Sequence, residues 1–202
     1  MWITWKHQHT ELTDDAPIEK KIEIFRERVL GWQLHVADLV INGGRDHDNV
    51  RDIASIPHSG FATLQILLSY FEMIACYEAG IAGKTKGQSR DLFIQGVQFA
   101  FPQVKSFPYA ATRNFLSHLY SSVRCGLYHT SIPGSGVGLA PTGIPIQFTD
   151  DPPQLVIDPH EFARALRTQF LDYVARLNDP SQVILRTAFE KRFDYEFKQW
   201  MV

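Results

Sequence analysis

The chain has 202 residues, 45% of them hydrophobic and 21% charged, so it can bury one core of ordinary size and should not be disordered as a whole. Its 20 basic and 22 acidic side chains give a formal net charge of -2. That balance excludes the bulk attraction to phosphate backbones shown by very basic nucleic-acid binders. Any contact with a nucleic acid must therefore be local.

Two features favour a cytoplasmic protein. Cys76 and Cys125 both lie within apolar helical patterns, whereas a secreted scaffold would place several cysteines between loops. The N-terminal residues show no basic start followed by an apolar stretch, and no window reaches the roughly 18 apolar residues that a membrane span needs. We therefore expect no membrane segment.

The first predicted element is a long amphipathic helix over residues 16–42. Asp14 and Asp15 are expected to cap its start, with Pro17 in its first turn, and Gly43-Gly44 to end it. Its apolar residues advance by alternating steps of four and three, which places them on one helical face. They are Ile18, Ile22, Phe25, Val29, Trp32, Val36 and Leu39.

Three further helices are predicted between residues 61 and 129. Residues 61–81 carry a wide apolar surface, which is typical of a central helix in a bundle. Glycines follow, and then a shorter helix near 89–101. Residues 109–129 form the next helix, which ends before Pro133-Gly134.

The pattern changes after Gly134 to glycines and prolines around two short β-prone runs, residues 144–148 and 154–157. These runs predict a small β-hairpin inserted at about 135–158. Asp158 then caps a new helix, and a final helix covers about 181–200. The predicted fold is an all-α bundle of five or six helices, forming a single domain over 1–202, with this hairpin as an insertion.

The segment from Tyr120 to His129 carries the most specific chemistry in the sequence. It places Arg124 and His129 five positions apart at the end of a predicted helix. Cleavage of RNA without a metal needs a group to transfer protons and a cation to stabilise the charge that develops on the phosphate. Histidine and arginine suit these two tasks.

This segment resembles the Arg-x4-6-His motif of HEPN domains, which are helical bundles with the motif near the end of a helix. The resemblance covers these ten residues in sequence and roughly residues 16–178 in architecture. It implies a metal-independent endoribonuclease that acts as a homodimer on RNA, in stress response or phage defence, without a metal or other cofactor. It also suggests an antitoxin-type protein partner.

Under this resemblance, Arg124 would stabilise the phosphate, His129 would transfer protons, and Tyr128 and Ser121 would help to position the RNA. Two departures oppose this assignment. The position after the arginine is often polar in active members but is Cys125 here. Five positions also rotate two side chains about 140° apart on a regular helix, unless Gly126 lets the last turn unwind.

A catalytically inactive HEPN-like module for RNA binding or protein assembly therefore remains the alternative. In that interpretation Arg124 and Glu72 are structural. Glu72 lies within the apolar stretch 70–74, where a carboxylate is costly unless it is paired, and Arg124 is the partner we expect. The other option for Glu72 is a surface position.

Other polar motifs favour ordinary structural roles. His47-Asp48 resembles a fragment of a metal-dependent phosphohydrolase site, but it follows two glycines and is expected to lie in a solvated loop. His7 and His9 lack further ligands at a recognisable spacing. Gly83-Lys84-Thr85 follows a helix and lacks the earlier glycine of a phosphate-binding loop. We expect a helix-breaking turn there.

The final helix carries aromatic residues at steps of four, Phe189, Phe193 and Phe197, with Trp200 beyond them. Such a stripe could stack on single-stranded nucleic acid, but it is more typical of a core or a dimer interface. We therefore expect it to be buried.

Overall fold

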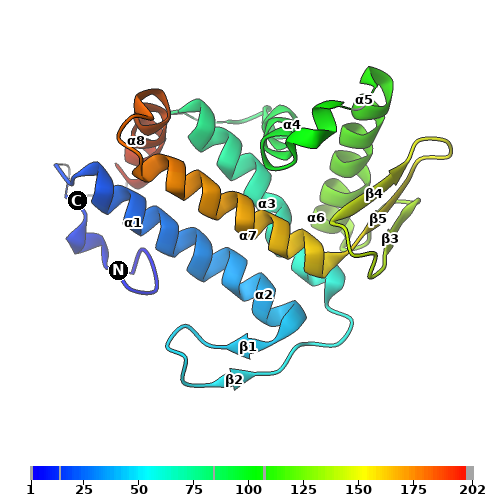
Figure 1. Ribbon diagram of the computed structural model, residues 1–202, viewed down its shortest axis with the longest axis horizontal. Helices are drawn as coiled ribbons and strands as arrows, with labels where there is room; N and C mark the ends of the chain where they lie inside the picture. The colour runs from blue at the N-terminus through cyan, green and yellow to red at the C-terminus, as the bar shows by residue number, and fades with distance from the viewer. Residues whose placement is uncertain (1, 14, 84, 107, 199–202) are drawn as a thin grey trace.

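The computed structural model describes residues 2–13, 15–83, 85–106 and 108–198 (Figure 1). Its helices in chain order are η1 (His9–Glu11), α1 (Ile18–Val29), η2 (Leu30–Leu34), α2 (His35–Asn42), α3 (Gly60–Ala79), α4 (Ser89–Ala100), η3 (Pro102–Ser106), α5 (Tyr109–His118), η4 (Leu119–Cys125), α6 (Gly126–Thr130), α7 (Pro159–Asn178) and α8 (Val183–Phe197). Its strands are β1 (Gly44–Arg45), β2 (Asp52–Ile53), β3 (Val137–Leu139), β4 (Ile146–Thr149) and β5 (Gln154–Ile157). The predicted mostly helical fold with small β elements is confirmed.

The long helix built from α1, η2 and α2 lies antiparallel to α7, and α3 runs behind this pair (Figure 1). α3 also packs against α4 and α8, so it is the central helix that its wide apolar surface predicted. By length and composition alone α3 could cross a membrane, but 61% of its most apolar window is buried inside the protein. That burial is typical of a core helix.

The predicted helix over 16–42 is confirmed as a continuous element from Ile18 to Asn42, with a π-helical segment at η2. Trp5 packs on this segment at Gly31, where a Cβ atom would lie 2.4 Å from the Trp5 ring. Gly43, with φ of 69°, ends the helix as expected.

The predicted capping of this helix by Asp15 is wrong. Pro17 itself occupies the cap position, so Asp15 lies too far back along the chain to reach the free N–H groups, and no side chain among the described residues caps α1. Asp15 instead accepts a hydrogen bond of 2.7 Å from the Thr13 hydroxyl. Asp14 lies outside the described residues.

The helix predicted over 109–129 is also confirmed, running through α5, η4 and α6 to Thr130. Its last turn does not unwind, because Gly126–Thr130 is regular α-helix. The helix widens one turn earlier, in the π-helical segment η4. There the Ser122 carbonyl accepts a 2.7 Å hydrogen bond from the Gly134 N–H, a bond made outside the helix.

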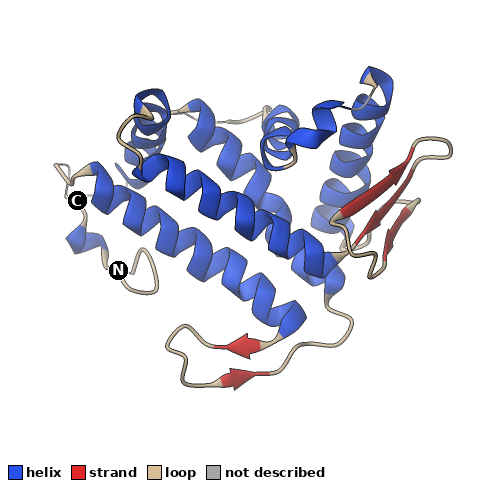
Figure 2. Cartoon of the chain, in the orientation of Figure 1, coloured by secondary structure: helices blue, strands red, loops and turns tan. Residues whose placement is uncertain are grey.

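The inserted hairpin is present as β4 and β5, which pair antiparallel, but the sheet has a third strand. β3 pairs parallel to β5, giving the order β3-β5-β4 at one end of the bundle (Figure 2). The T-shaped contact between Phe148 and Phe115 packs β4 against α5. The pair β1 and β2, within the predicted loop after Gly43, was also not expected.

The two C-terminal helices follow their sequence signals. The Asp158 carboxylate accepts hydrogen bonds from the backbone N–H groups of His160 and Glu161, at 3.1 and 3.3 Å, which confirms the predicted cap of α7. The aromatic stripe of α8 is buried in the core, as expected: Phe189, Phe193 and Phe197 are each at most 1% exposed. Trp200 lies outside the described residues.

Candidate functional site

Arg124 projects from η4 towards α3, where Glu72 binds it as predicted. Its Nε and Nη2 atoms donate to one oxygen of Glu72, at 3.1 and 2.7 Å, and Nη2 also donates to the Ser89 hydroxyl at 3.2 Å. Burial disfavours the charged guanidinium, but the hydrogen bond and charge of Glu72 outweigh it and raise the pKa of Arg124. The arginine is therefore held as a permanent cation.

This ion pair leaves one edge of the guanidinium unused. Among the described residues, Nη1 of Arg124 has no hydrogen-bond partner. Because Glu72 and Ser89 fix the plane of the group, its two remaining N–H donors have a set direction. Such an edge can donate to an anionic oxygen without first breaking the bond to Glu72.

A pocket of about 390 Å³ adjoins Arg124 in the groove between α3 and the η4–α6 helix. Its residues come from one face of each helix, since those on α3 recur at steps of three and four. They are Gln65, Ile66, Leu68, Ser69, Glu72, Arg124, Leu127 and Tyr128. The pocket thus combines an apolar floor with the Arg124–Glu72 ion pair at its side.

Tyr128 forms the exposed wall of this pocket. Its side chain is 67% exposed, and the Arg124 guanidinium carbon lies 4.8 Å from the centre of its ring. That distance fits a cation–π contact. Ser121, in contrast, does not line the pocket, and its exposed hydroxyl donates to the Ser117 carbonyl oxygen at 2.7 Å on the same helix. The expected positioning role has geometric support only for Tyr128.

His129 is exposed at the end of α6 and does not line the pocket beside Arg124. Its ring packs edge-on to Tyr128, with 5.4 Å between ring centres. No contact joins it to Arg124 in the described part of the chain. One copy of the chain therefore does not bring the two motif residues onto a common point, as expected from their rotation around a helix.

The helix containing the motif cannot readily accept a larger residue at Gly126. A Cβ atom there would lie 2.7 Å from the Ile132 carbonyl oxygen and 3.0 Å from the Gly134 nitrogen. The chain after α6 therefore folds back closely against the motif helix. Cys125, next to Arg124, is half-buried and free of any disulfide. The close approach of residues 132–134 explains why position 126 is a glycine. The structure assigns no chemical role to Cys125.

Within the described residues, no group of three or more His, Cys, Asp or Glu side chains is placed to hold a metal ion. His7 is buried, with its ring nitrogens 2.9 Å from Glu11 and 3.4 Å from Glu23. His47 is half-buried rather than solvated, because its ring packs against Trp5 and His35. The loop that was predicted there is part of the β1–β2 hairpin.

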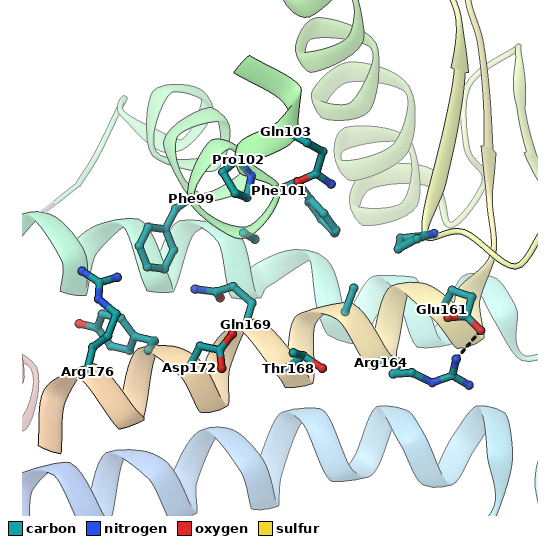
Figure 3. A pocket seen from close by; sticks show the side chains of 14 residues that line it. Phe99, Phe101, Pro102, Gln103, Glu161, Arg164, Thr168, Gln169, Asp172 and Arg176 are labelled. Atoms are coloured by element: carbon teal, nitrogen blue, oxygen red, sulfur yellow. Dashed lines mark hydrogen bonds and ion pairs between the residues drawn. The ribbon is translucent and has the colours of Figure 1, made fainter. Parts of the chain in front are cut away.

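A larger cavity, of about 520 Å³, lies between α7 and the chain from α4 to η3 (Figure 3). Its charged groups are largely paired: Arg164 lies 2.5 Å from Glu161, and Arg176 lies 3.5 Å from Glu78. Neither cavity is lined by histidine or cysteine, but the motif pocket is the one that adjoins the exposed Tyr128 and His129. We therefore take the motif pocket as the candidate site, despite its smaller volume.

Sequence reasoning missed Ser89 and Gln65, which complete the surroundings of Arg124. Ser89 reaches the arginine from the first residue of a third helix, and no local pattern could have indicated that contact. Gln65 lies seven positions before Glu72, so the two share a face of α3, a signal that could have found it.

Comparisons of the chain with protein-family models, with curated proteins and with solved structures found no match.

Proposed function

We propose that this chain is a HEPN-like, metal-independent endoribonuclease whose active site is completed by a second copy of the same chain. The observation that carries the proposal is the fixed Arg124 guanidinium, with a free Nη1 edge, at a pocket next to the exposed Tyr128 and His129. The proposal places the protein in the cytoplasm, in stress response or phage defence, with an antitoxin-type partner to restrain it.

The proposed reaction is an internal transesterification of RNA. The His129 imidazole accepts the proton of a ribose 2'-hydroxyl, and the 2' oxygen attacks the adjacent phosphorus. The bond from phosphorus to the 5' oxygen breaks, and that oxygen takes a proton from water. The products are a 2',3'-cyclic phosphate and a 5'-hydroxyl, and the imidazolium returns its proton to solvent. Arg124 stabilises the charge that develops on the phosphate oxygens.

A second copy is required because one chain keeps the two groups apart. Arg124 faces the groove with α3, while His129 is exposed outside it. A second chain that docks over the end of α6 can bring its own His129 to the phosphate held by the first chain's Arg124. The exposed apolar side chain of Ile132, at 69% exposure, lies three positions after His129. It suits such a contact between copies.

The alternative function is a catalytically inactive HEPN-like module that binds RNA or a protein. The observation in its favour is that Glu72 and Ser89 already occupy both Nη2 and Nε of Arg124. A role in holding α3, α4 and the motif helix together would need no chemistry from the arginine. Cys125, at a position that is often polar in active members, points the same way.

Cleavage of a mixed structured and unstructured RNA pool in EDTA tests the proposal against this alternative. The purified chain should cleave, leaving cyclic phosphate ends, and a folded His129→Ala variant should be slower by about 100-fold or more, since it lacks the group that transfers the proton. Thr187→Ala, which changes an exposed hydroxyl on α8 that is bonded within its own helix, serves as the control. Cleavage that His129→Ala leaves unchanged would contradict the proposal.

A further inference from the structure

We infer that the pocket between α3 and the motif helix binds one unpaired nucleotide, with Tyr128 as the stacking surface and Gln65 as the group that reads the base. This inference rests on the proposed function, because it assigns the RNA feature that the site would recognise. It is nevertheless testable by binding alone.

The pocket has the size and lining of a small-ligand site. Its volume of about 390 Å³ falls within the range of known ligand pockets, roughly 300–1,000 Å³. Its floor is apolar and formed by Ile66, Leu68 and Leu127, which suits the flat face of a nucleobase. The fixed Arg124 guanidinium lies at its side, where the phosphate of the same nucleotide would lie.

Tyr128 offers an aromatic face at the open side of this pocket. Its side chain is 67% exposed, so a base can stack on the ring face that the Arg124 guanidinium, 4.8 Å from the ring centre, leaves open. Stacking on an aromatic ring requires the base to be unpaired and splayed out of a helix. The site should therefore select single strands, loops or ends over duplex RNA.

Gln65 is the polar group best placed to distinguish bases. Its Nε2 donates to the Leu127 carbonyl oxygen at 3.4 Å, which leaves its amide oxygen and a second N–H for a ligand. The Ser69 hydroxyl, in contrast, accepts from Gln33 and donates to the Ile66 carbonyl oxygen, so both of its roles are used. An amide matches the adjacent donor and acceptor of adenine.

Equilibrium binding of labelled oligoribonucleotides in EDTA, at one fixed salt concentration, tests the inference. The protein used is the His129→Ala chain, which should not cleave the probes, and the probes are oligo(A), oligo(U) and their duplex. We expect oligo(A) to bind more tightly than oligo(U), and both to bind more tightly than the duplex.

The pocket variants should separate stacking from base reading. Tyr128→Ala should weaken oligo(A) binding about tenfold while Tyr128→Phe retains it, because the ring and not the hydroxyl stacks. Gln65→Ala should abolish the preference for oligo(A) over oligo(U). Tyr109→Ala, which removes an 82% exposed ring far from the pocket, is the matched control.

The binding experiment and the cleavage experiment can fail independently, so the nucleotide pocket and the nuclease function are tested separately. No binding, equal binding of duplex and single strand, or oligo(A) affinity unchanged in both Tyr128→Ala and Gln65→Ala would overturn the nucleotide pocket, even if the native chain cleaves RNA. The expected binding pattern in a native chain that does not cleave would support the pocket and refute the nuclease.

Discussion

At the scale of residues, the Arg124–Glu72 pair is the part of the candidate site that the sequence could predict. A carboxylate within an apolar helical stretch needs a partner unless it lies at the surface, and Arg124 was the partner that we expected. The position of Ser89 and the free Nη1 edge could not be predicted, since both depend on how three helices meet. The π-helical segment η4, from which the Arg124 side chain projects, could not be predicted from the sequence either.

Removing Glu72 should destabilise the fold, because it leaves the Arg124 charge in a half-buried site. The two side chains are 26% and 19% exposed, so the cost falls below that of a fully buried pair. We expect Glu72→Ala to lower the free energy of unfolding by about 1–2 kcal/mol in urea titrations. Asp52→Ala, which breaks the exposed pair with Arg45, should change it by less than about 0.5 kcal/mol.

At the scale of elements, the long helices could be predicted from the sequence. Helical periodicity indicated the amphipathic ones, and a long, widely apolar stretch indicated the central helix α3. The hairpin strands β4 and β5 were predicted, whereas β1, β2 and β3 escaped prediction for a physical reason. β3 has three residues, one of them Gly138, and exists only because it pairs with β5. The β1–β2 pair has two residues in each strand, which is too short for an alternating pattern to show.

The contact between α3 and α4 depends on Gly96. A Cβ atom at this position would lie 2.0 Å from the Phe71 carbonyl oxygen, in the backbone of a neighbouring helix that cannot move freely. Gly96→Ala should therefore destabilise the protein by about 3 kcal/mol or more, seen as a lower Tm in thermal unfolding. Gly138→Ala, where a Cβ would meet nothing within 4 Å, is the control that should leave Tm nearly unchanged.

A cluster of three rings connects the N-terminal segment, the β1–β2 hairpin and α2. His47 lies between Trp5 and His35, at 4.7 and 4.4 Å between ring centres. Burial and the nearby charges of His47 and Arg167 lower the pKa of His35, against the opposing charge of Asp38 and a hydrogen bond involving the Arg45 backbone. Its Nε2 is also buried without a partner among the described residues.

This environment predicts a dependence of stability on pH. Because the folded-state pKa of His35 lies below its unfolded value of about 6.5, the unfolded chain binds more protons as the pH falls through that value. The contribution of His35 is therefore present above about pH 6.5 and lost below it. His35→Gln should reduce the fall in unfolding free energy between about pH 7.5 and pH 5. An equal fall in the variant would contradict this account, and His58→Asn, in an exposed loop, is the control.

At the scale of the whole molecule, the bundle presents the motif at the C-terminal end of the continuous α5–η4–α6 helix, beside α3. α3 lies at the centre of the core, so the wall of the pocket that carries Glu72 and Gln65 is fixed. The other wall ends at the exposed Tyr128, and His129 lies next to it outside the pocket. Under the proposed function, a second copy meets this end, and the two motif residues of one active site come from different chains.

Activity of a mixed dimer tests that claim most directly. Arg124→Ala and His129→Ala chains carrying different affinity tags are co-expressed, and the mixed dimer is isolated by capture on both tags. Each variant alone should cleave RNA in EDTA about 100-fold more slowly than the native chain. The mixed dimer should recover a measurable share of the native rate, because one of its two sites combines an intact Arg124 with an intact His129. A mixed dimer as inactive as its parents, alongside an active native chain, would contradict a site shared between two copies.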